Sequence, residues 1–260
     1  MGRFEETLDA LFGGKLMLAQ SRAGYRFALD TLLLADFVTV KEREKIVDLG
    51  TGNGVIPLIL ASRHPSVTLT GVELQPGMVE RARRNIELNG MQSRIQILQG
   101  DVRAAESLPG EGRFDAAVCN PPYRKPGSGR ISPMDEKRIA RHETQGELGD
   151  FARAGARLLR GKGRLAVVYP AERAMDLLTA LRQARTEPKR LRAVHSFAGA
   201  EACLVLVEAV KGGKAGLVIE PPLIIYERGH EYTDEVATII RGHRRRARSR
   251  GKANPWVCGA

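Results

Sequence analysis

The chain has 260 residues, which is enough for one large domain with a well-covered core and too few for two full independent domains. It carries 41 lysines and arginines against 30 acidic residues, a formal net charge of +11. Residues 241–260 hold seven of the basic side chains and no acid, so residues 1–240 carry only 11 − 7 = +4. We expect this tail to be either a solvated, flexible end or an arm that binds a polyanion.

Cysteine usage and hydropathy exclude several classes of protein. Cys119, Cys203 and Cys258 are too few and too scattered for a disulfide framework, and no Cys/His cluster indicates a metal site. Residues 1–14 place acids where a signal peptide would have bases, and no apolar stretch reaches the roughly 18 residues of a membrane span. The sequence therefore predicts a reduced, cytoplasmic protein with neither a metal nor a membrane partner.

Alternating short β-branched runs and longer amphipathic stretches, from residue 45 onward, predict a sheet covered by helices on both faces. Before that point, residues 1–44 predict a short helix, a strand in KLMLAQ (15–20) and an apolar helix over 30–38. Strands are then expected over 45–50, 67–74, 94–100, 114–120 and 163–170, and helices over 55–63, 76–89, 147–159 and 171–185. Residues 121 to about 146 are rich in Pro and Gly and are expected to be irregular.

Two last strands are predicted over 190–197 and 202–210. Only four residues separate them, too few for a crossover helix, so they should form an antiparallel hairpin at the end of an otherwise parallel sheet. A dinucleotide-binding dehydrogenase would continue with parallel units, so this ending disfavours that class. We expect an N-terminal extension over 1–44, one domain over 45–240 and a basic tail over 241–260.

A glycine-rich turn, DLGTGNG (48–54), joins the first strand to the first helix. Glycines there let the backbone turn tightly and approach a ligand at the carboxyl edge of the sheet. Because residue 55 is Val, the nicotinamide fingerprint G-x-G-x-x-G is absent. The alternative is a structural turn without a ligand.

Carboxylates follow the next two strands. Glu73 ends the second strand, where it could accept hydrogen bonds from both ribose hydroxyls, and Asp101 follows the third, where it could receive an adenine amino group. Taken alone, Glu73 could be an exposed strand terminus and Asp101 the N-cap of a helix starting at Val102. Together with the glycine turn they indicate a ligand that contains adenosine.

The sharpest motif is Asn120-Pro121-Pro122-Tyr123, directly after the fourth strand. Two prolines remove backbone donors, so the Asn120 side-chain oxygen and the Pro121 carbonyl could form adjacent acceptors for both hydrogens of a planar NH₂ group. Tyr123 could lie flat against a conjugated ring. The alternative is an ordinary loop with Tyr123 at its rim.

These motifs, DLGTGNG, VEL (72–74), GDVR (100–103) and NPPY (120–123), resemble those of class I S-adenosylmethionine-dependent methyltransferases that act on a planar nitrogen. The resemblance implies a doubly wound α/β fold, with a mostly parallel seven-stranded sheet ending in an antiparallel hairpin. The segments 24–37 (GYRFALDTLLLADF) and 217–240 (LVIEPPLIIYERGHEYTDEVATII) are similar to bacterial tRNA adenine-N6 methyltransferases that modify the adenine next to the anticodon of a valine tRNA.

The resemblance also implies the roles of individual residues. The glycines would approach the methionine part of S-adenosylmethionine, Glu73 would hold its ribose and Asp101 its adenine, and Asp30 would lie beside it, unless Asp30 is the N-cap of its helix. The catalytic residues implied are Asn120, Pro121, Pro122 and Tyr123, with no metal. The implied cofactor-binding set is Asp30, Asp48, Gly50, Gly52, Gly54, Glu73, Leu74, Asp101, Val102 and Asn120.

The function implied is methylation of the N6 amino group of an adenine in RNA, with tRNA as the partner. Three alternatives remain open: a protein glutamine-N5 methyltransferase, a guanine-N2 ribosomal RNA methyltransferase, and a non-catalytic RNA-binding protein of the same fold. The release-factor glutamine enzymes carry a helical domain upstream, whereas about 44 residues precede the sheet here. RNA contacts are expected from the basic residues of 124–141 and from the tail, with Trp256 as a possible stacking residue.

Overall fold

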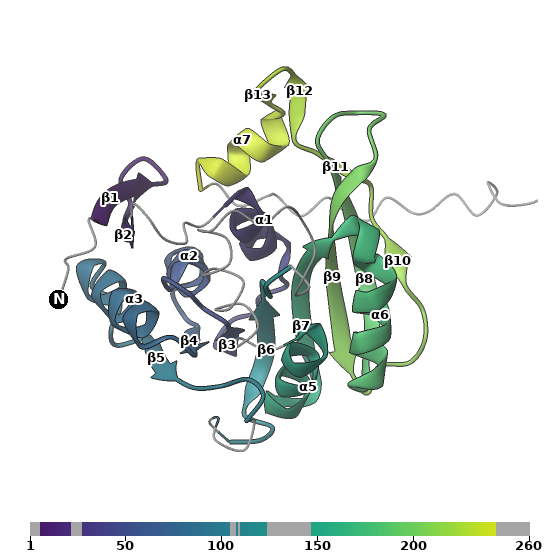
Figure 1. Cartoon of the computed structure of the whole chain (residues 1–260). Helices are drawn as coiled ribbons and strands as arrows, with labels where there is room; N and C mark the ends of the chain where they lie inside the picture. Colours follow the sequence, from purple (N-terminus) through teal and green to yellow (C-terminus); the bar gives the residue numbers. More distant parts are fainter. Residues whose placement is uncertain (1–5, 22–27, 105–107, 109, 124–146, 243–260) are drawn as a thin grey trace, which may run out of the picture.

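A nine-stranded mixed sheet forms the centre of the protein. The computed structural model describes residues 6–21, 28–104, 108, 110–123 and 147–242. The strands of the sheet are β3 (Lys45–Leu49), β4 (Thr68–Glu73), β5 (Ile95–Gln99), β6 (Phe114–Cys119), β7 (Leu159–Pro170), β8 (Thr186–His195), β9 (Ala202–Lys211), β10 (Val218–Ile219) and β11 (Leu223–Ile224). Their order is β10-β8-β9-β7-β6-β3-β4-β5, and β11 also pairs with β8 (Figure 1).

The predicted antiparallel hairpin at the end of the sheet is confirmed. Strands β3 to β7 pair in parallel, whereas β9 runs antiparallel to both β7 and β8. The sheet has two more strands than the seven expected, because β10 and β11 each add a two-residue parallel pairing to the outer edge of β8. Pro221 and Pro222 separate these two strands, and proline cannot donate to a ladder, so the segment pairs in two short pieces.

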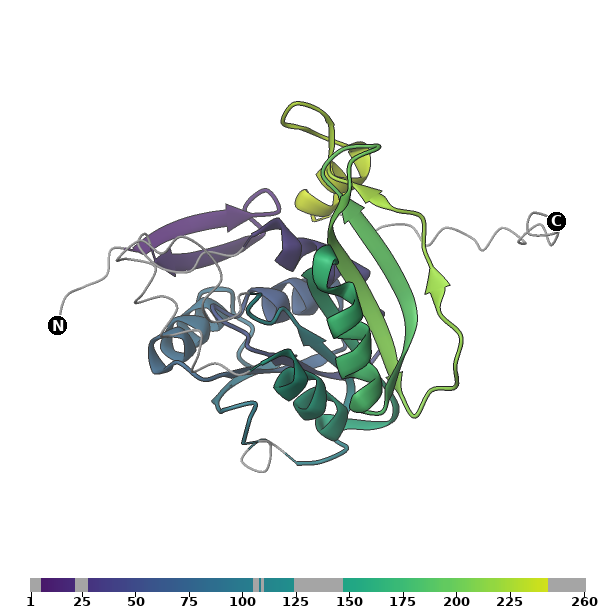
Figure 2. The same cartoon turned by 45° about the vertical axis from the view of Figure 1, so that its right-hand side comes forward.

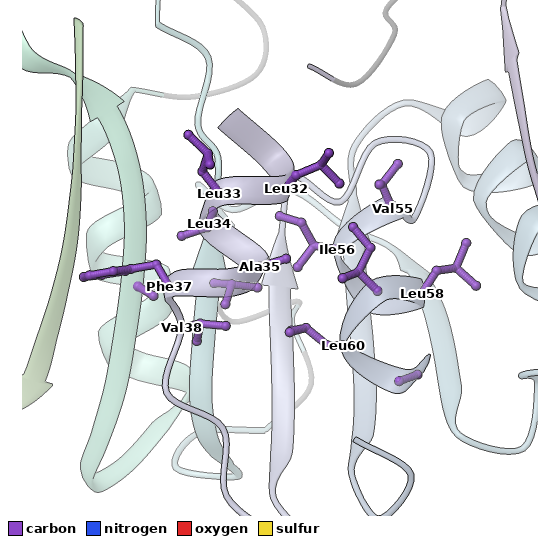
Figure 3. Close-up of a cluster of buried hydrophobic side chains, with 14 of the residues drawn as sticks. Leu32, Leu33, Leu34, Ala35, Phe37, Val38, Val55, Ile56, Leu58 and Leu60 are labelled. Atoms are coloured by element: carbon purple, nitrogen blue, oxygen red, sulfur yellow. The ribbon is translucent and has the colours of Figure 1, made fainter. Parts of the chain in front are cut away.

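Helices cover both faces of the sheet. One face carries α1 (Leu29–Phe37), α2 (Val55–Arg63) and α3 (Pro76–Leu88), and the other carries α5 (Leu148–Leu158) and α6 (Ala174–Gln183). Neighbouring residues of a strand point to opposite faces, so Ile46 belongs to the first core and Val47 to the second. Figure 3 shows apolar side chains of α1 and α2, with Leu32 and Ile56 on the sides where the two helices face each other.

The prediction of a short helix before KLMLAQ is wrong. Residues 6–11 form a strand, β1 (Glu6–Leu11), which pairs antiparallel with β2 (Leu16–Ser21). The chain turns between them with positive φ angles at Phe12, Gly13 and Gly14, a conformation that a helix cannot contain. Strand pairing has overridden the helix propensity of the Glu, Leu and Ala residues in this segment.

Asn85 of α3 and Asn89, the residue that caps the C-terminus of α3, hydrogen-bond to the edge of β2 that does not pair with β1. Asn85 Oδ1 accepts from the Ala19 N–H (2.8 Å) and its Nδ2 donates to the Ala19 carbonyl (3.1 Å). Asn89 makes the equivalent pair with the backbone of Met17 (2.9 and 2.7 Å). Asn85 Nδ2 also donates to the carbonyl of Asn53 (2.9 Å), so one buried side chain connects β2, α3 and the glycine turn.

The chain after β11 forms a small hairpin and a helix. The hairpin consists of β12 (Tyr226–Arg228) and β13 (Glu231–Tyr232), and α7 (Asp234–Ile240) follows it (Figure 2). Val236 and Ile239 of α7 are buried in the same core as α1 and α2. No helix in the described part of the chain is long and apolar enough to cross a membrane.

We expect Asn85→Ala to lower the free energy of unfolding by about 2–4 kcal/mol, because it leaves the Ala19 backbone and the Asn53 carbonyl without their partners. Glu87→Ala, an exposed change on the same helix, should alter it by less than about 0.5 kcal/mol. Urea denaturation measures both. Equal effects of the two substitutions would contradict this role for Asn85.

Candidate active site

The glycine turn after β3 is closely enclosed by its neighbours. Gly50, Gly52 and Gly54 all have positive φ angles (71°, 56° and 79°), which residues other than glycine rarely adopt. A Cβ at Gly50 would lie 3.2 Å from the ring of Phe151 on α5, and one at Gly54 would lie 3.3 Å from Ala82 on α3. The glycines are thus needed both for the turn and for its packing between two helices.

Glu73, at the end of β4, is tied to this turn. Its Oε2 accepts from the Gly52 N–H (3.0 Å) and its Oε1 from the Gln75 N–H (2.9 Å). The side chain is buried, and burial raises its pKa above the ordinary value although backbone N–H groups oppose the shift. The alternative of an exposed strand terminus is therefore wrong. Leu74, next in the chain, is half-buried.

Asp48, at the start of the turn, belongs to a cluster of buried polar side chains together with Thr51 and Asn53. Neither of its carboxylate oxygens, nor Thr51 Oγ1, nor Asn53 Nδ2 has a hydrogen bond of normal geometry to any described residue. Burial, reinforced by the negative charge of Glu73 and offset in part by Thr51, raises the pKa of Asp48 to about 7. Buried polar atoms are nearly always paired in native proteins, so these four atoms are candidates for hydrogen bonds to a bound polar ligand.

Asp101 follows β5 at the same edge. Its Oδ1 accepts from the Arg103 N–H (2.9 Å) and its Oδ2 lies 2.6 Å from the Arg103 guanidinium, which lowers the pKa of the carboxyl. The Ala104 N–H donates to the Asp101 carbonyl, so residues 101–104 form a turn and Asp101 caps no helix there. An adenine amino group would have to share this carboxylate with Arg103. Val102 is buried in the second core.

The NPPY segment follows β6, and its tyrosine is held by several side chains. The Tyr123 hydroxyl lies 2.5 Å from Asn120 Oδ1 and 2.8 Å from Asp30 Oδ2. Its ring makes an edge contact with Tyr169 (centroids 5.8 Å apart, 86° between the planes). Arg173 Nη1 donates to the Tyr123 carbonyl (3.0 Å). Tyr123 is therefore fixed at its hydroxyl, its ring and its backbone.

Asp30 lies in the first turn of α1 and does not cap the helix. Ala28 is the N-cap residue, and Asp30 Oδ1 accepts from the N–H of its neighbour Thr31 (2.6 Å). Thr31 Oγ1 in turn accepts from Asn120 Nδ2 (3.3 Å). The start of α1 thus orients both polar side chains of NPPY.

Motif spacing did not indicate Thr31, Tyr169 or Arg173. Tyr169 and Arg173 follow the pattern of functional side chains at the carboxyl ends of parallel strands, because β7 ends at Pro170. That rule could have found them. Thr31 carries no such signal.

The two halves of the site begin side by side. Leu49 and Cys119, the last residues of β3 and β6, are register partners, so the glycine turn and NPPY leave the sheet from adjacent positions. The whole basic segment 124–141 and all of the tail after residue 242, including Trp256, lie outside the described residues. Within the part described, no group of three or more His, Cys, Asp or Glu side chains is placed to hold a metal ion.

A sheet of this order, with its polar residues gathered at the carboxyl edge, defines the class I methyltransferase fold. The model of the methyltransferase small domain family matches residues 26–191, and the chain belongs to that family. A solved structure described as a predicted O-methyltransferase from Agrobacterium tumefaciens is 27% identical, covers 84% of this chain and 99% of its own, and superposes with a TM-score of 0.70.

Two of the curated relatives have the same name. A tRNA1(Val) (adenine(37)-N6)-methyltransferase of Porphyromonas gingivalis is 36% identical over 164 residues, 62% of this chain and 64% of the relative. One of the same name from Tolumonas auensis is 30% identical over 183 residues, 67% of this chain and 75% of the relative. The chain thus spans just under two thirds of the length of the Porphyromonas protein.

The raised pKa of Asp48 predicts a pH-dependent stability. Between its ordinary pKa, about 4, and about 7, the folded protein keeps a proton on Asp48 that the unfolded chain has lost. The free energy of unfolding should therefore fall through this range as pH rises, relative to Asp48→Asn, which cannot ionise. The difference should become constant above the folded-state pKa.

Urea denaturation of both proteins across the range measures this difference. Glu42→Gln, at an exposed loop position, is the control and should follow the wild type. A difference between wild type and Asp48→Asn that does not change with pH would contradict a buried, proton-holding Asp48.

Proposed function

We propose that the protein transfers the methyl group of S-adenosylmethionine to the N6 amino group of an adenine in RNA, most specifically in tRNA next to the anticodon. The observation that carries this proposal is the NPPY segment at the end of β6, with Tyr123 fixed beside Asn120. The names of the curated relatives support the same substrate. A cytoplasmic location is what this substrate requires.

The turn after β3 is suited to hold the cofactor. The glycines leave room for the backbone to approach it, and the orphaned atoms of Asp48, Thr51 and Asn53 offer it polar contacts. The buried carboxylate of Glu73 would accept hydrogen bonds from the ribose, and Leu74 and Val102 follow Glu73 and Asp101 in the chain. S-adenosylmethionine supplies an electrophilic methyl group on a positively charged sulfur.

The target amino group needs alignment because its lone pair is delocalised into the adenine ring. Asn120 Oδ1 and the Pro121 carbonyl would accept its two hydrogens and turn the lone pair toward the methyl group. These hydrogen bonds strengthen as positive charge grows on the nitrogen, so they stabilise the transition state more than the bound substrate. The methylated nitrogen is acidic and loses its proton readily, so no dedicated base is needed.

Tyr123 would have two roles in this step. Its ring would stack on the everted base and offset part of the few kcal/mol that unstacking costs. Its hydroxyl has one proton, which can be donated to Asn120 or to Asp30 but not to both. Donation to Asp30 leaves Asn120 Oδ1 available to the target amino group.

Tritiated methyl transfer tests the substrate. We expect incorporation into tRNA, with N6-methyladenosine as the product identified by mass spectrometry of nucleosides. Incorporation into release factor or formation of N2-methylguanosine would replace the proposal with one of its enzymatic alternatives. Failure to bind S-adenosylmethionine in calorimetry would favour a non-catalytic RNA-binding protein.

Substitutions in NPPY test the mechanism. Asn120→Ala should lower kcat about 100-fold or more, since one positioned hydrogen-bonding group contributes on this order, with the affinity for S-adenosylmethionine kept. Tyr123→Ala should lower kcat/KM about 5- to 150-fold through lost stacking, and Tyr123→Phe, which keeps the ring, by less.

The matched control is Gln96→Ala, which removes an exposed amide from β5 at the edge of the sheet and should leave turnover unchanged. Steady-state kinetics with tRNA measures kcat and KM for the three NPPY variants and for this control. Near-wild-type turnover by Asn120→Ala would exclude the proposed grip on the amino group.

A further inference from the structure

Four aromatic side chains gather where the β12–β13 hairpin meets the β8–β9 turn. Tyr226 stacks on Tyr232 (centroids 5.1 Å apart, 22° between the planes), and Phe197 leans on Tyr226 (5.5 Å, 37°). His230 makes an edge contact with Tyr226 (6.2 Å, 89°). We call these four residues the aromatic cluster. Tyr226, His230 and Tyr232 lie in the segment 217–240, and Phe197 packs against it. No residue of this segment has a role in the proposed binding of the cofactor or the target amino group.

The outer members of the cluster face solvent. Phe197 is 39% and Tyr232 41% exposed, and neither belongs to or packs against the two hydrophobic cores. Tyr226 alone packs against a core, the one beneath α1 and α2. Exposed, contiguous aromatic surface on a folded protein indicates an interaction site. Packing of Tyr226 against the core is enough to anchor the hairpin. The exposed rings of Phe197 and Tyr232 are not needed to hold the hairpin in place.

Backbone hydrogen bonds hold the rings in place. The N–H groups of Ile225 and Tyr226 donate to the carbonyls of His195 (2.8 Å) and Ser196 (2.9 Å). Thr233 makes two further hydrogen bonds: its N–H donates to the Ile225 carbonyl (3.0 Å), and its hydroxyl donates to the Ile224 carbonyl (2.7 Å). Binding to such a fixed surface loses little conformational entropy.

The cluster lies at the same edge of the sheet as the candidate active site. Because β9 is antiparallel to both β7 and β8, β8 runs parallel to β6 and ends at the edge where NPPY begins. Figures 1 and 2 both show the β12–β13 hairpin beyond this edge. Three strand spacings, about 14 Å, separate β6 from β8. The end of β6 is level with Leu191, and β8 continues for four residues, about 13 Å, to His195. The two offsets combine to about 19 Å, which corresponds to about six stacked nucleotides at 3.4 Å each.

The charges around the cluster favour stacking over attraction of phosphates. Arg228 and His230 are exposed there, and so are Glu227 and Glu231, so the hairpin itself has little net charge. Stacking on an aromatic ring needs no local positive charge and accepts any base, because every base has a π-face. The basic tail begins directly after α7 and is the separate source of positive charge.

We propose that the aromatic cluster is a stacking platform for one or two unpaired bases of the RNA substrate, within a few nucleotides of the target adenine. The proposal rests on the proposed function, since it takes the ligand to be RNA. The exposed faces of Tyr232 and Phe197 receive the bases, and Tyr226 and the hairpin hold those faces in position.

Kinetics and binding with the full chain and unmodified tRNA test the platform. Tyr232→Ala and Phe197→Ala should each weaken tRNA binding and raise KM about 5- to 150-fold, while kcat and the affinity for S-adenosylmethionine stay unchanged. Tyr232→Phe, which keeps the ring, should bind tRNA within about twofold of wild type. Met175→Ala removes an exposed apolar side chain from α6 and is the matched control, expected to have no effect.

Photocrosslinking gives a readout that does not depend on a variant folding correctly. Wild-type protein irradiated with tRNA containing 4-thiouridine should yield crosslinked peptides that contain Phe197 or Tyr232. Crosslinks only elsewhere, or unchanged tRNA affinity in both alanine variants, would overturn the platform. If wild type transfers no methyl group to RNA, the proposed function fails instead, and the two failures are distinguished by that single measurement.

Discussion

The hydrogen bond from the Gly52 N–H to the buried carboxylate of Glu73 is the contact on which the proposed cofactor side of the candidate active site depends. It joins the turn after β3 to the end of β4, and it fixes the carboxylate at the position expected for a ribose. The same turn also receives a hydrogen bond from Asn85 on α3. A short loop in left-handed geometry is thus held from the sheet and from a helix, which preorganises it for a ligand.

The proposed target side is organised around Tyr123 in a comparable way. The tyrosine belongs to the loop after β6, but its contacts come from α1, from β7 and from the chain after β7 as well as from Asn120. The register pairing of β3 with β6 brings this loop next to the glycine turn. Two separately braced halves therefore meet at one edge of the sheet, and the relative position of the halves follows from strand register.

The order of strands and helices could be predicted from the sequence because its signals are local. β-branched runs, the proline near the start of α3 and the short separation of β8 from β9 each act within a few residues. The strand Glu6–Leu11 could not be found in this way, since its residues favour a helix and only pairing with β2 makes it extended. Motifs likewise predicted Glu73 and Asn120, whereas Thr31 reaches NPPY through tertiary packing that no spacing reveals.

The β8–β9 hairpin determines what lies beside the candidate active site as well as the fold class. If β8 and β9 followed each other in parallel, a crossover would carry the chain back across one face, and no β8–β9 turn would lie at the edge of the candidate active site. The antiparallel reversal at residues 196–201 instead puts a turn there, and β11 brings the following chain to the same place. The aromatic cluster is formed by those two segments. The antiparallel order of the last strands therefore adds a rigid surface at the same edge of the sheet as the candidate active site.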